Sequence, residues 1–353
     1  MSSSSMSIDR SQRLSSIEIA GEPFEIGFQL GRHGADATHA HLIRTHAWAH
    51  VTDSKNHDRV QASRRLTETL FPRYFEELRG LAAGLELPLE DVFAWNCRGD
   101  IWAMSPDGCT TVQIPGAEPI VAHNEDGDPG LRRGCALATV RPSEGRAFTA
   151  FVYPASLPGH TFAVNDAGLV VTVNNIRSRE TGQGLPRMVV TRALLDCGSL
   201  DEAVERVKTT PRAGAFHLTL ARSGEANILG LEFTHKHLSV QTVRRPSCHA
   251  NHLIHQGIGT ERQVVTCSSK SRQERADEMI AAAGDNVDPL AILRDTTQSA
   301  LPIYRQQPDD PDNENTLATA CFKIGTDKVD CTIYDGYDTS PRFRFKSDAL
   351  SPA

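Results

Sequence analysis

The residue pair of this chain best suited to chemistry is Gly108-Cys109, a cysteine that directly follows a glycine. A thiol next to the preceding carbonyl can attack it and convert the amide into a thioester, which water then hydrolyses. Gly108 has no Cβ and tolerates the strained backbone that such an attack needs. Cleavage would leave Cys109 with a free α-amine beside its thiol, and this amine can serve as a general base. The alternative is a buried structural thiol.

Composition and charge describe an ordinary globular protein. The chain has 353 residues, of which 39% are hydrophobic and 23% charged, enough for one large domain or two smaller ones. A formal net charge of -7, without any basic block, argues against a nucleic-acid partner. The eight cysteines form no CxxC pair and no disulfide framework, which is typical of a reducing compartment.

The beginning of the chain resembles a frayed tail. Residues Met1 to Met6 are polar and lack the apolar stretch of a signal peptide. No apolar run is as long as a membrane span. We therefore expect a cytoplasmic protein without a membrane partner.

Upstream of Cys109 the sequence predicts helices. A short strand is expected at 17–20, followed by a turn into helical spacing from about 28 to 83. Within that stretch one apolar face of a long helix is predicted from Leu66, Leu70, Tyr74, Leu78 and Leu81. Another helix starts near 89 and runs through Asn96, and a loop then carries Cys109.

Downstream of Thr110 the period changes to that of strands. Segments rich in β-branched and aromatic residues, bounded by Gly, Pro and Asn, predict strands at 120–122, 136–140, 147–152, 169–173, 216–220, 228–231, 318–324 and 329–334. Helices are predicted from Pro186 through Leu195, after the capping box at Ser199, at about 269–283, and from Asp288-Pro289. Residues 306–315 are expected to form a surface loop, and the chain to end in a loose tail. Helices over two antiparallel sheets indicate an α+β fold.

Six segments resemble the acyl-coenzyme A:isopenicillin N acyltransferase family, peptidase family C45, within the N-terminal nucleophile hydrolase superfamily. In chain order they are Gly21–Gly27, Phe71–Gly80, Asp107–Thr111, Asn124–Asp126, Gly168–Ile176 and His249–His252. The resemblance implies a four-layer αββα sandwich and a zymogen that cleaves itself before the cysteine. The fragments would be a helical segment 1–108 and a segment 109–353 that begins with the nucleophile, both in one domain. It also implies amide hydrolysis or acyl transfer.

The resemblance assigns roles residue by residue. Cys109 matches the nucleophile and Asp126 the acidic residue near the new N-terminus, where a carboxylate would hold the α-amine and raise its basicity. Asn251 matches the amide that stabilises the oxyanion.

Supporting residues are less sharply assigned. Thr111 belongs to the junction motif, while Asn174 and Asn175 both match polar pocket positions. Ser271-Arg272 matches a Ser-Arg pair, although Arg275 lies one turn away and is an alternative.

One position departs from the related conjugated-bile-salt and penicillin V hydrolases, which have arginine where this chain has His123. Bile salts and penicillin V are therefore not the expected substrates. His249, His252 and His255 could indicate a metal site, but they lack the acidic partner of a helical zincin, and we interpret them as exposed or hydrogen-bonding histidines. No metal or other cofactor is predicted.

Two functions of different classes follow. The first is a self-processing amidohydrolase acting on a small-molecule amide, with an acyltransferase as its alternative. The second is a catalytically silent binding protein on the same fold. The expected partners are a small-molecule substrate and a second copy of the chain in a homo-oligomer. The two cleavage fragments are also expected to stay associated with each other.

Overall fold

The computed structural model describes residues 13–104, 108–258, 260–306, 314–336 and 340–347, which form two sheets. The eight-stranded sheet has the order β1 (Ser15–Gly21), β4 (Ala136–Pro142), β5 (Phe148–Val152), β6 (Phe162–Asn165), β7 (Leu169–Asn175), β8 (Phe216–Arg222), β9 (Leu229–Phe233) and β10 (Leu238–Thr242). The six-stranded sheet has the order β11 (Ser247–His249), β2 (Gly108–Ile114), β3 (Ile120–Gly127), β12 (Asn315–Ile324), β13 (Val329–Tyr334) and β14 (Phe343–Lys346).

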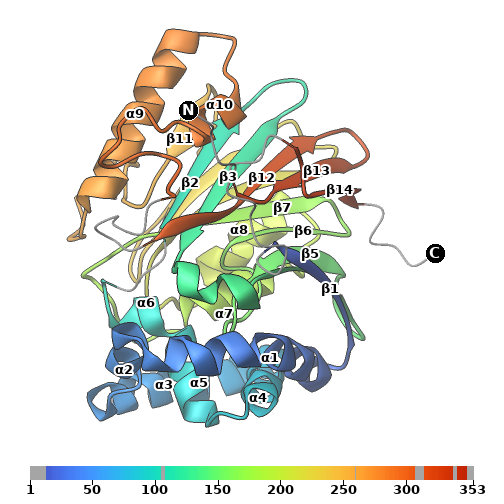
Figure 1. Cartoon of the computed structure of the whole chain (residues 1–353), viewed down its shortest axis with the longest axis vertical. Coiled ribbons are helices and arrows are strands. Elements are labelled where there is room, and N and C mark those ends of the chain that lie inside the picture. The colour runs from blue at the N-terminus through green and yellow to red at the C-terminus, as the bar shows by residue number, and fades with distance from the viewer. Residues whose placement is uncertain (1–12, 105–107, 259, 307–313, 337–339, 348–353) are drawn as a thin grey trace, which may run out of the picture.

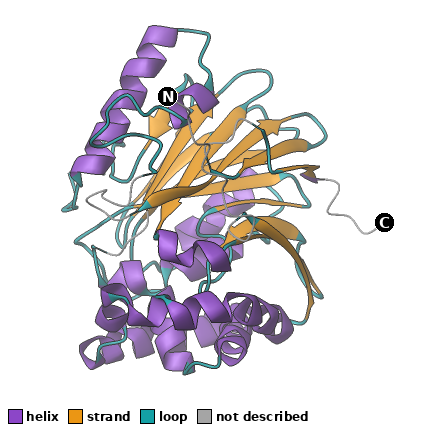
Figure 2. Cartoon of the chain, in the orientation of Figure 1, coloured by secondary structure: helices purple, strands orange, loops and turns teal. Residues whose placement is uncertain are grey.

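The helices lie on the two outer sides of these sheets (Figures 1 and 2). They are α1 (Pro23–Ala40), α2 (His46–Val51), α3 (His57–Leu70), α4 (Pro72–Leu85), α5 (Leu89–Asn96), α6 (Arg98–Ile101), α7 (Arg187–Leu194), α8 (Leu200–Thr209), α9 (Cys267–Ala283) and α10 (Pro289–Leu293). Helices α9 and α10 contact the six-stranded sheet, and α8 contacts the eight-stranded sheet. The fold is the predicted four-layer αββα sandwich.

The segment before Cys109 is built into the same core as the segment after it. Strand β1 pairs with β4 over seven residues, from Ser15↔Ala136 to Gly21↔Pro142. This pairing is parallel, a departure from the predicted antiparallel sheets. It is made possible by the long connection between β1 and β4, which contains α1 to α6 and the β2–β3 hairpin. One hydrophobic cluster contains Leu78 and Trp95 from the first segment and Phe151 from the second.

The predicted long helix is two helices, α3 and α4. A helical break falls at Phe71, which has φ −137° and ψ 61°, because Pro72 disfavours helical backbone at the residue before it. Tyr74 and Leu78 are buried as predicted, whereas Leu70 is 47% exposed. The prediction of one helix was wrong because the apolar residues keep a helical spacing across the boundary between α3 and α4.

The Phe71–Gly80 segment has a packing role. Gly80 allows α4 to approach α1 closely, since a Cβ on Gly80 would lie 1.9 Å from the carbonyl oxygen of Phe24. Glu77 on the same helix forms a buried ion pair with Arg192 of α7, with an Nη2–Oε1 distance of 2.7 Å.

Helix starts were the most predictable local features. The hydroxyl of Ser199 accepts the N–H of Glu202 at the start of α8, and Asp288 caps α10 in the same way through Leu290 N–H.

Several strands were not predicted. Cys109 lies in β2, not in a loop, and β6, β10, β11 and β14 were missed. Strand β14 lies in the predicted tail, where it pairs with β13. Of the predicted surface loop, residues 307–313 lie outside the described residues, while Glu314 is 1% exposed and was wrongly placed at the surface.

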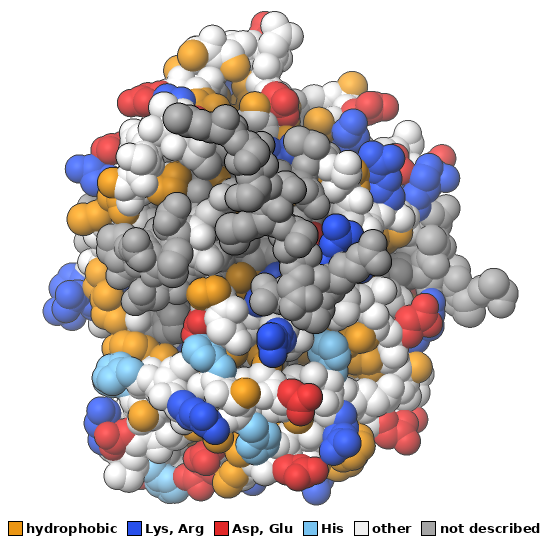
Figure 3. Space-filling view, viewed as in Figure 1, with side chains coloured by type: hydrophobic (Ala, Val, Ile, Leu, Met, Phe, Trp, Pro, Cys, Tyr) orange, Lys and Arg blue, Asp and Glu red, His pale blue; other side chains and the backbone are white. Residues whose placement is uncertain are grey.

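Charges of both signs are interspersed on the face shown in Figure 3, and histidines lie over the N-terminal helices at its lower end. Among the described residues, no helix combines the length and the apolar character that crossing a membrane requires.

Candidate active site

The thiol of Cys109 lies inside the sandwich, because Cys109 is only 2% exposed. Because side chains alternate along a strand, Cys109 shares a face of β2 with Thr111 and Gln113. Thr111 Oγ1 donates to Asn174 on β7, and Gln113 Nε2 donates to Thr219 on β8. This face of β2 therefore looks into the space between the sheets.

Two side chains from separate segments hold the backbone of Cys109. Its N–H donates to Oδ1 of Asn251 at 3.0 Å, and its carbonyl accepts from Nη1 of Arg272 at 2.6 Å. Arg272 also donates to Asn251 Oδ1 at 2.7 Å and to the hydroxyl of Thr110 at 2.8 Å. Asn251 and Arg272 thus fix the orientation of the peptide groups at Cys109.

The amide of Asn251 has a defined orientation. Its Nδ2 donates to the carbonyl oxygen of Asn175 at 3.1 Å, and its backbone N–H donates to Ser269 Oγ at 2.8 Å. In the intact chain the oxygen of this amide therefore faces Cys109. The oxyanion role predicted for Asn251 needs Nδ2 and stays a prediction.

Gly108 lies across the β2–β3 ladder from Asp126. A Cβ on Gly108 would lie 2.4 Å from Glu314 Oε2 and 3.0 Å from Arg305 Nη1. A larger residue at position 108 would therefore require Glu314 or Arg305 to move. The tolerance of backbone strain at Gly108 stays a prediction.

Asp126 is completely buried beside the predicted cleavage position. Its Oδ1 accepts from Thr316 Oγ1 at 2.6 Å, and its Oδ2 lies 4.0 Å from Arg305 Nη1. Burial raises the pKa of Asp126, while the charges of Arg305 and Arg272 oppose that rise. Asp126 thus lies across the ladder from Gly108, the residue directly before the nitrogen that cleavage would free.

The residues between which the sequence left a choice differ in their contacts. The side chain of Asn174 reaches Thr111 and the His249 carbonyl, whereas Asn175 contributes its backbone carbonyl to Asn251. Arg272 faces Cys109, and Arg275 instead pairs with Asp295 at 3.0 Å.

Ser271 does not join the site. Its hydroxyl donates to Gln298 Oε1 at 2.5 Å and to the Leu301 carbonyl at 3.1 Å. Ser269, two residues earlier on α9, is the serine that contacts Asn251.

A chain of buried polar side chains leads away from the thiol of Cys109. Its Sγ lies 3.8 Å from Glu125 Oε2, which lies 3.1 Å from His123 Nε2. His123 Nδ1 is 2.8 Å from Thr111 Oγ1, which is 2.7 Å from Asn174 Oδ1. The ligand-type atoms of Cys109, His123 and Glu125 lie within 4.8 Å of one another. Both ring nitrogens of His123 make hydrogen-bonding contacts, one to Thr111 and one to Glu125. We interpret Cys109, Glu125, His123 and Thr111 as a network that can pass protons.

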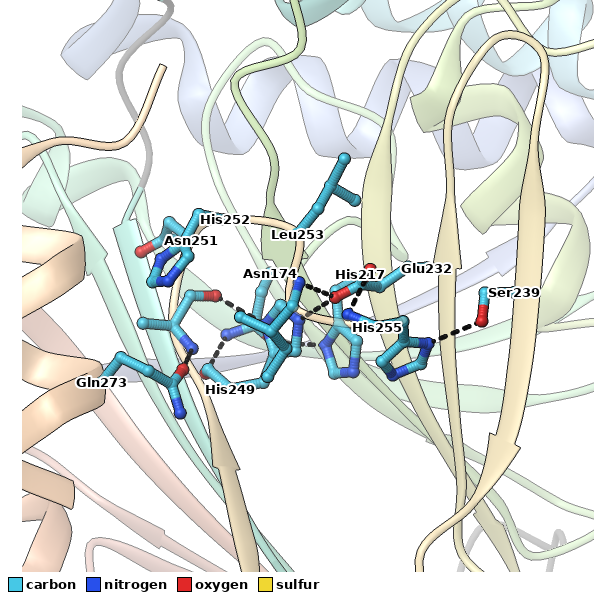
Figure 4. A network of polar contacts seen from close by, with 12 residues as sticks. Asn174, His217, Glu232, Ser239, His249, Asn251, His252, Leu253, His255 and Gln273 are labelled. Carbon is cyan, nitrogen blue, oxygen red and sulfur yellow. Dashed lines mark hydrogen bonds and ion pairs between the residues drawn. The ribbon is translucent and has the colours of Figure 1, made fainter. Parts of the chain in front are cut away.

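A second network of polar contacts includes Asn174 and the His249–Asn251 segment (Figure 4). The rings of His217 and His249 stack with centroids 3.5 Å apart, and His249 Nε2 contacts Glu232 Oε1 at 2.9 Å. Burial lowers the pKa of His217 far below its ordinary value. His255 donates its backbone N–H to Glu232 Oε2. The histidines predicted as hydrogen-bonding do form hydrogen bonds.

Sequence reasoning missed Glu125, Arg305 and Glu314. The two-residue strand period from Val121 through His123 places Glu125 on the same face of the strand as His123, but its position across from Cys109 depends on the β2–β3 register. Arg305 and Glu314 pair at 2.7 Å, and both lie close to a stretch that looked like exposed loop.

Comparisons with known proteins agree on one family. The sequence profile described as acyl-coenzyme A:6-aminopenicillanic acid acyl-transferase matches residues 114–336. The chain is 21% identical over 393 aligned residues to beta-alanyl-dopamine/carcinine hydrolase of Drosophila melanogaster, covering 97% of this chain and 98% of the relative. It is 24% identical over 319 residues to the 40 kDa form of acyl-coenzyme A:6-aminopenicillanic-acid-acyltransferase of Emericella nidulans, covering 86% and 87%.

Proposed function

The chain belongs to the acyl-coenzyme A:6-aminopenicillanic acid acyl-transferase family, and from this premise we propose that it is a self-processing N-terminal cysteine amidohydrolase. Its substrate is a small amide, an N-acyl or aminoacyl amide, cleaved through a thioester acyl-enzyme. The observation that carries the proposal is the setting of Cys109, whose amide N–H and carbonyl are both held by buried side chains next to a glycine.

Maturation breaks the Gly108–Cys109 amide bond. The Cys109 sulfur attacks the Gly108 carbonyl carbon, the nitrogen of Cys109 leaves with a proton, and a thioester forms between the two residues. Water then hydrolyses the thioester to a Gly108 carboxylate and a free thiol. The 2% exposure of Cys109 supports maturation as a requirement, because an uncleaved chain offers substrate little access to the sulfur.

Turnover uses the groups that maturation releases. The α-amine of Cys109 takes the thiol proton, the thiolate attacks the substrate carbonyl, and the amine product leaves with that proton. Asp126 holds the α-amine, and Asn251 with a backbone N–H stabilises the oxyanion. Water completes hydrolysis of the acyl-enzyme.

The alternative is acyl transfer, in which an amine takes the place of water. The Emericella nidulans relative, named as an acyltransferase, favours it. The Drosophila melanogaster relative, named as a hydrolase, covers more of the chain and favours hydrolysis. A binding protein without catalysis is the third possibility, and only an enzyme on this scheme runs as two fragments on a denaturing gel.

Product analysis tests the hydrolase proposal. Processed wild-type protein is screened with N-acyl amino acids, β-alanyl amides, β-lactams and acyl-coenzyme A donors, with uncut Cys109→Ala as the matched control. An active donor is then tested again with a nucleophilic amine at modest concentration. We expect free acid to exceed amide product. An excess of amide product would replace hydrolysis by acyl transfer, and equal rates for Cys109→Ala would remove Cys109 as the nucleophile.

A further inference from the structure

We propose that Glu125 and His123 take up the thiol proton of Cys109 during self-cleavage. This inference rests on the proposed function and adds a proton acceptor for its first step. In the intact chain the nitrogen of Cys109 is a peptide nitrogen, so it cannot act as the base that it becomes after cleavage. Another base is needed for maturation.

Glu125 is placed for this role by the β2–β3 ladder. It lies directly across from Cys109, and strand alternation puts His123 on the same face two residues earlier. Glu125 Oε2 lies 3.8 Å from Cys109 Sγ and 3.1 Å from His123 Nε2. All three residues are at most 2% exposed, so water does not offer an easy alternative acceptor.

A count of protons shows that Glu125 and His123 share one. The Asn174 amide is oriented by its Nδ2, which donates to the His249 carbonyl, so its Oδ1 must accept the only proton of Thr111. Thr111 Oγ1 therefore accepts from His123 Nδ1, which must carry a hydrogen. The contact between His123 Nε2 and Glu125 Oε2 then requires one further proton between these two atoms.

The neighbours of the pair favour its neutral form. Burial lowers the pKa of His123. Because Nδ1 already carries a hydrogen, we place the shared proton on Glu125, which leaves Nε2 as an acceptor. Of the other titratable groups that face the pair, burial raises the pKa of Cys135 and lowers that of His217, which keeps both neutral. Arg272 is a nearby cation, and it is bound to the Cys109 carbonyl.

The step conserves protons and bonds. The thiol proton moves to Glu125 Oε2 while the carboxyl proton moves to His123 Nε2, and the sulfur attacks the Gly108 carbonyl carbon. When the C–N bond breaks, Glu125 gives its proton to the leaving nitrogen of Cys109, and the proton on His123 Nε2 returns to Glu125. The products are a thioester and an α-amine, with Glu125 and His123 returned to their initial state.

Glu125→Gln is the decisive variant, because glutamine keeps the size and a hydrogen bond but cannot relay a proton. Formation of fragment 109–353 is followed by intact mass after purification of the precursor. We expect the processing rate to fall by about 10²–10⁴-fold, the range for a positioned general base. Wild-type processing should be nearly independent of pH from 6.5 to 8.5, whereas Glu125→Gln processing should rise with pH as hydroxide replaces the relay.

Controls separate the relay from folding and from the proposed function. Asp100→Asn removes another buried carboxyl group outside the site and should process at the wild-type rate. The melting temperature of uncut Glu125→Gln is compared with that of uncut Cys109→Ala, and similar values exclude misfolding. Wild-type processing and an unchanged pH profile in Glu125→Gln would overturn the relay. Processing of Cys109→Ala would instead overturn the proposed function.

Discussion

Cys109 is surrounded by buried charges whose signs alternate, and this arrangement explains how they are tolerated. Arg272 is 1% exposed, and burial lowers its pKa while Asp126 counteracts that effect. Arg305 stands between Asp126 and Glu314, at 4.0 and 2.7 Å. Removing one partner of such a set leaves an uncompensated buried charge, which typically costs about 3–5 kcal/mol. A substitution that removes one charge from this set therefore needs a stability measurement beside the activity measurement.

Asn251→Ala tests the oxyanion role at the residue scale. We expect kcat of processed enzyme to fall by about 10²–10³-fold with little change in KM, because the hydrogen bond strengthens mainly in the transition state. Steady-state kinetics per cleaved molecule give the answer. Asn251 also holds the Cys109 N–H, so slower maturation should accompany the loss. An unchanged kcat would exclude Asn251 from the oxyanion site.

Asp126→Asn tests the orientation of the α-amine. The unperturbed pKa of an α-amine is roughly 7.7–8.0, and a neighbouring carboxylate raises it by favouring the charged form. Removing that charge lowers the α-amine pKa, so the rising limb of the pH–rate profile should move to lower pH while the plateau falls. Measurement of kcat/KM from pH 5 to 10 checks this. A rising limb at the wild-type position would contradict the assignment.

At the scale of elements, α6 is tied to α7 through one buried carboxyl group. Asp100 accepts the backbone N–H of Arg187 at 3.3 Å, and Arg59 donates to its carbonyl at 2.8 Å. Burial raises the pKa of Asp100 to about 7, although Arg187 and Arg59 pull it down. This contact links the last helix before the predicted cleavage position to a helix of the second fragment.

Asp100 should make stability depend on pH in a defined direction. The folded chain binds the Asp100 proton more tightly than the unfolded chain, whose pKa is near 3.9, so stability is lost as pH rises from about 4 to 7. Asp100→Asn removes this contribution and should raise the melting temperature near pH 8 by several degrees relative to wild type. Thermal unfolding of uncut forms in the Cys109→Ala background measures it. Parallel pH curves would refute the prediction.

Elements with a local signal were predictable and those that depend on partners were not. Ser199 and Asp288 marked helix starts through their own side chains, and the β-branched run of β7 marked a buried strand. Strand β2 was missed although Thr110 to Ile114 include β-branched residues, because Gly108 at its start disfavours strands and the pairing with β3 is not visible in the sequence. The α3–α4 break was missed although Pro72 marked it.

The site residues also differ in whether a local sequence signal was enough to find them. Cys109, Asp126 and Asn251 were named from motifs, and the choice of Arg272 over Arg275 required the contact with the Cys109 carbonyl. Glu125 sits directly beside Asp126 in sequence but points to the opposite face of β3. Its relation to the thiol depends on the β2–β3 register, which residue types alone do not specify.

For the whole molecule, self-cleavage would convert one chain into two that stay interlocked. Strand β1 adds an edge to the sheet formed by the second fragment, and helices from the first segment share its main hydrophobic cluster. Burial of this kind contributes roughly 25 cal/mol per Å² of apolar surface, without any covalent link. The two fragments should therefore remain one particle under native conditions.

Self-cleavage before Cys109 can be measured by mass spectrometry of the purified protein. Under denaturing conditions we expect two species, residues 1–108 and a fragment whose N-terminal residue is Cys109, and under native conditions one complex of both. Cys109→Ala should give only the full-length chain. A single full-length species that has full amidase activity would contradict the account.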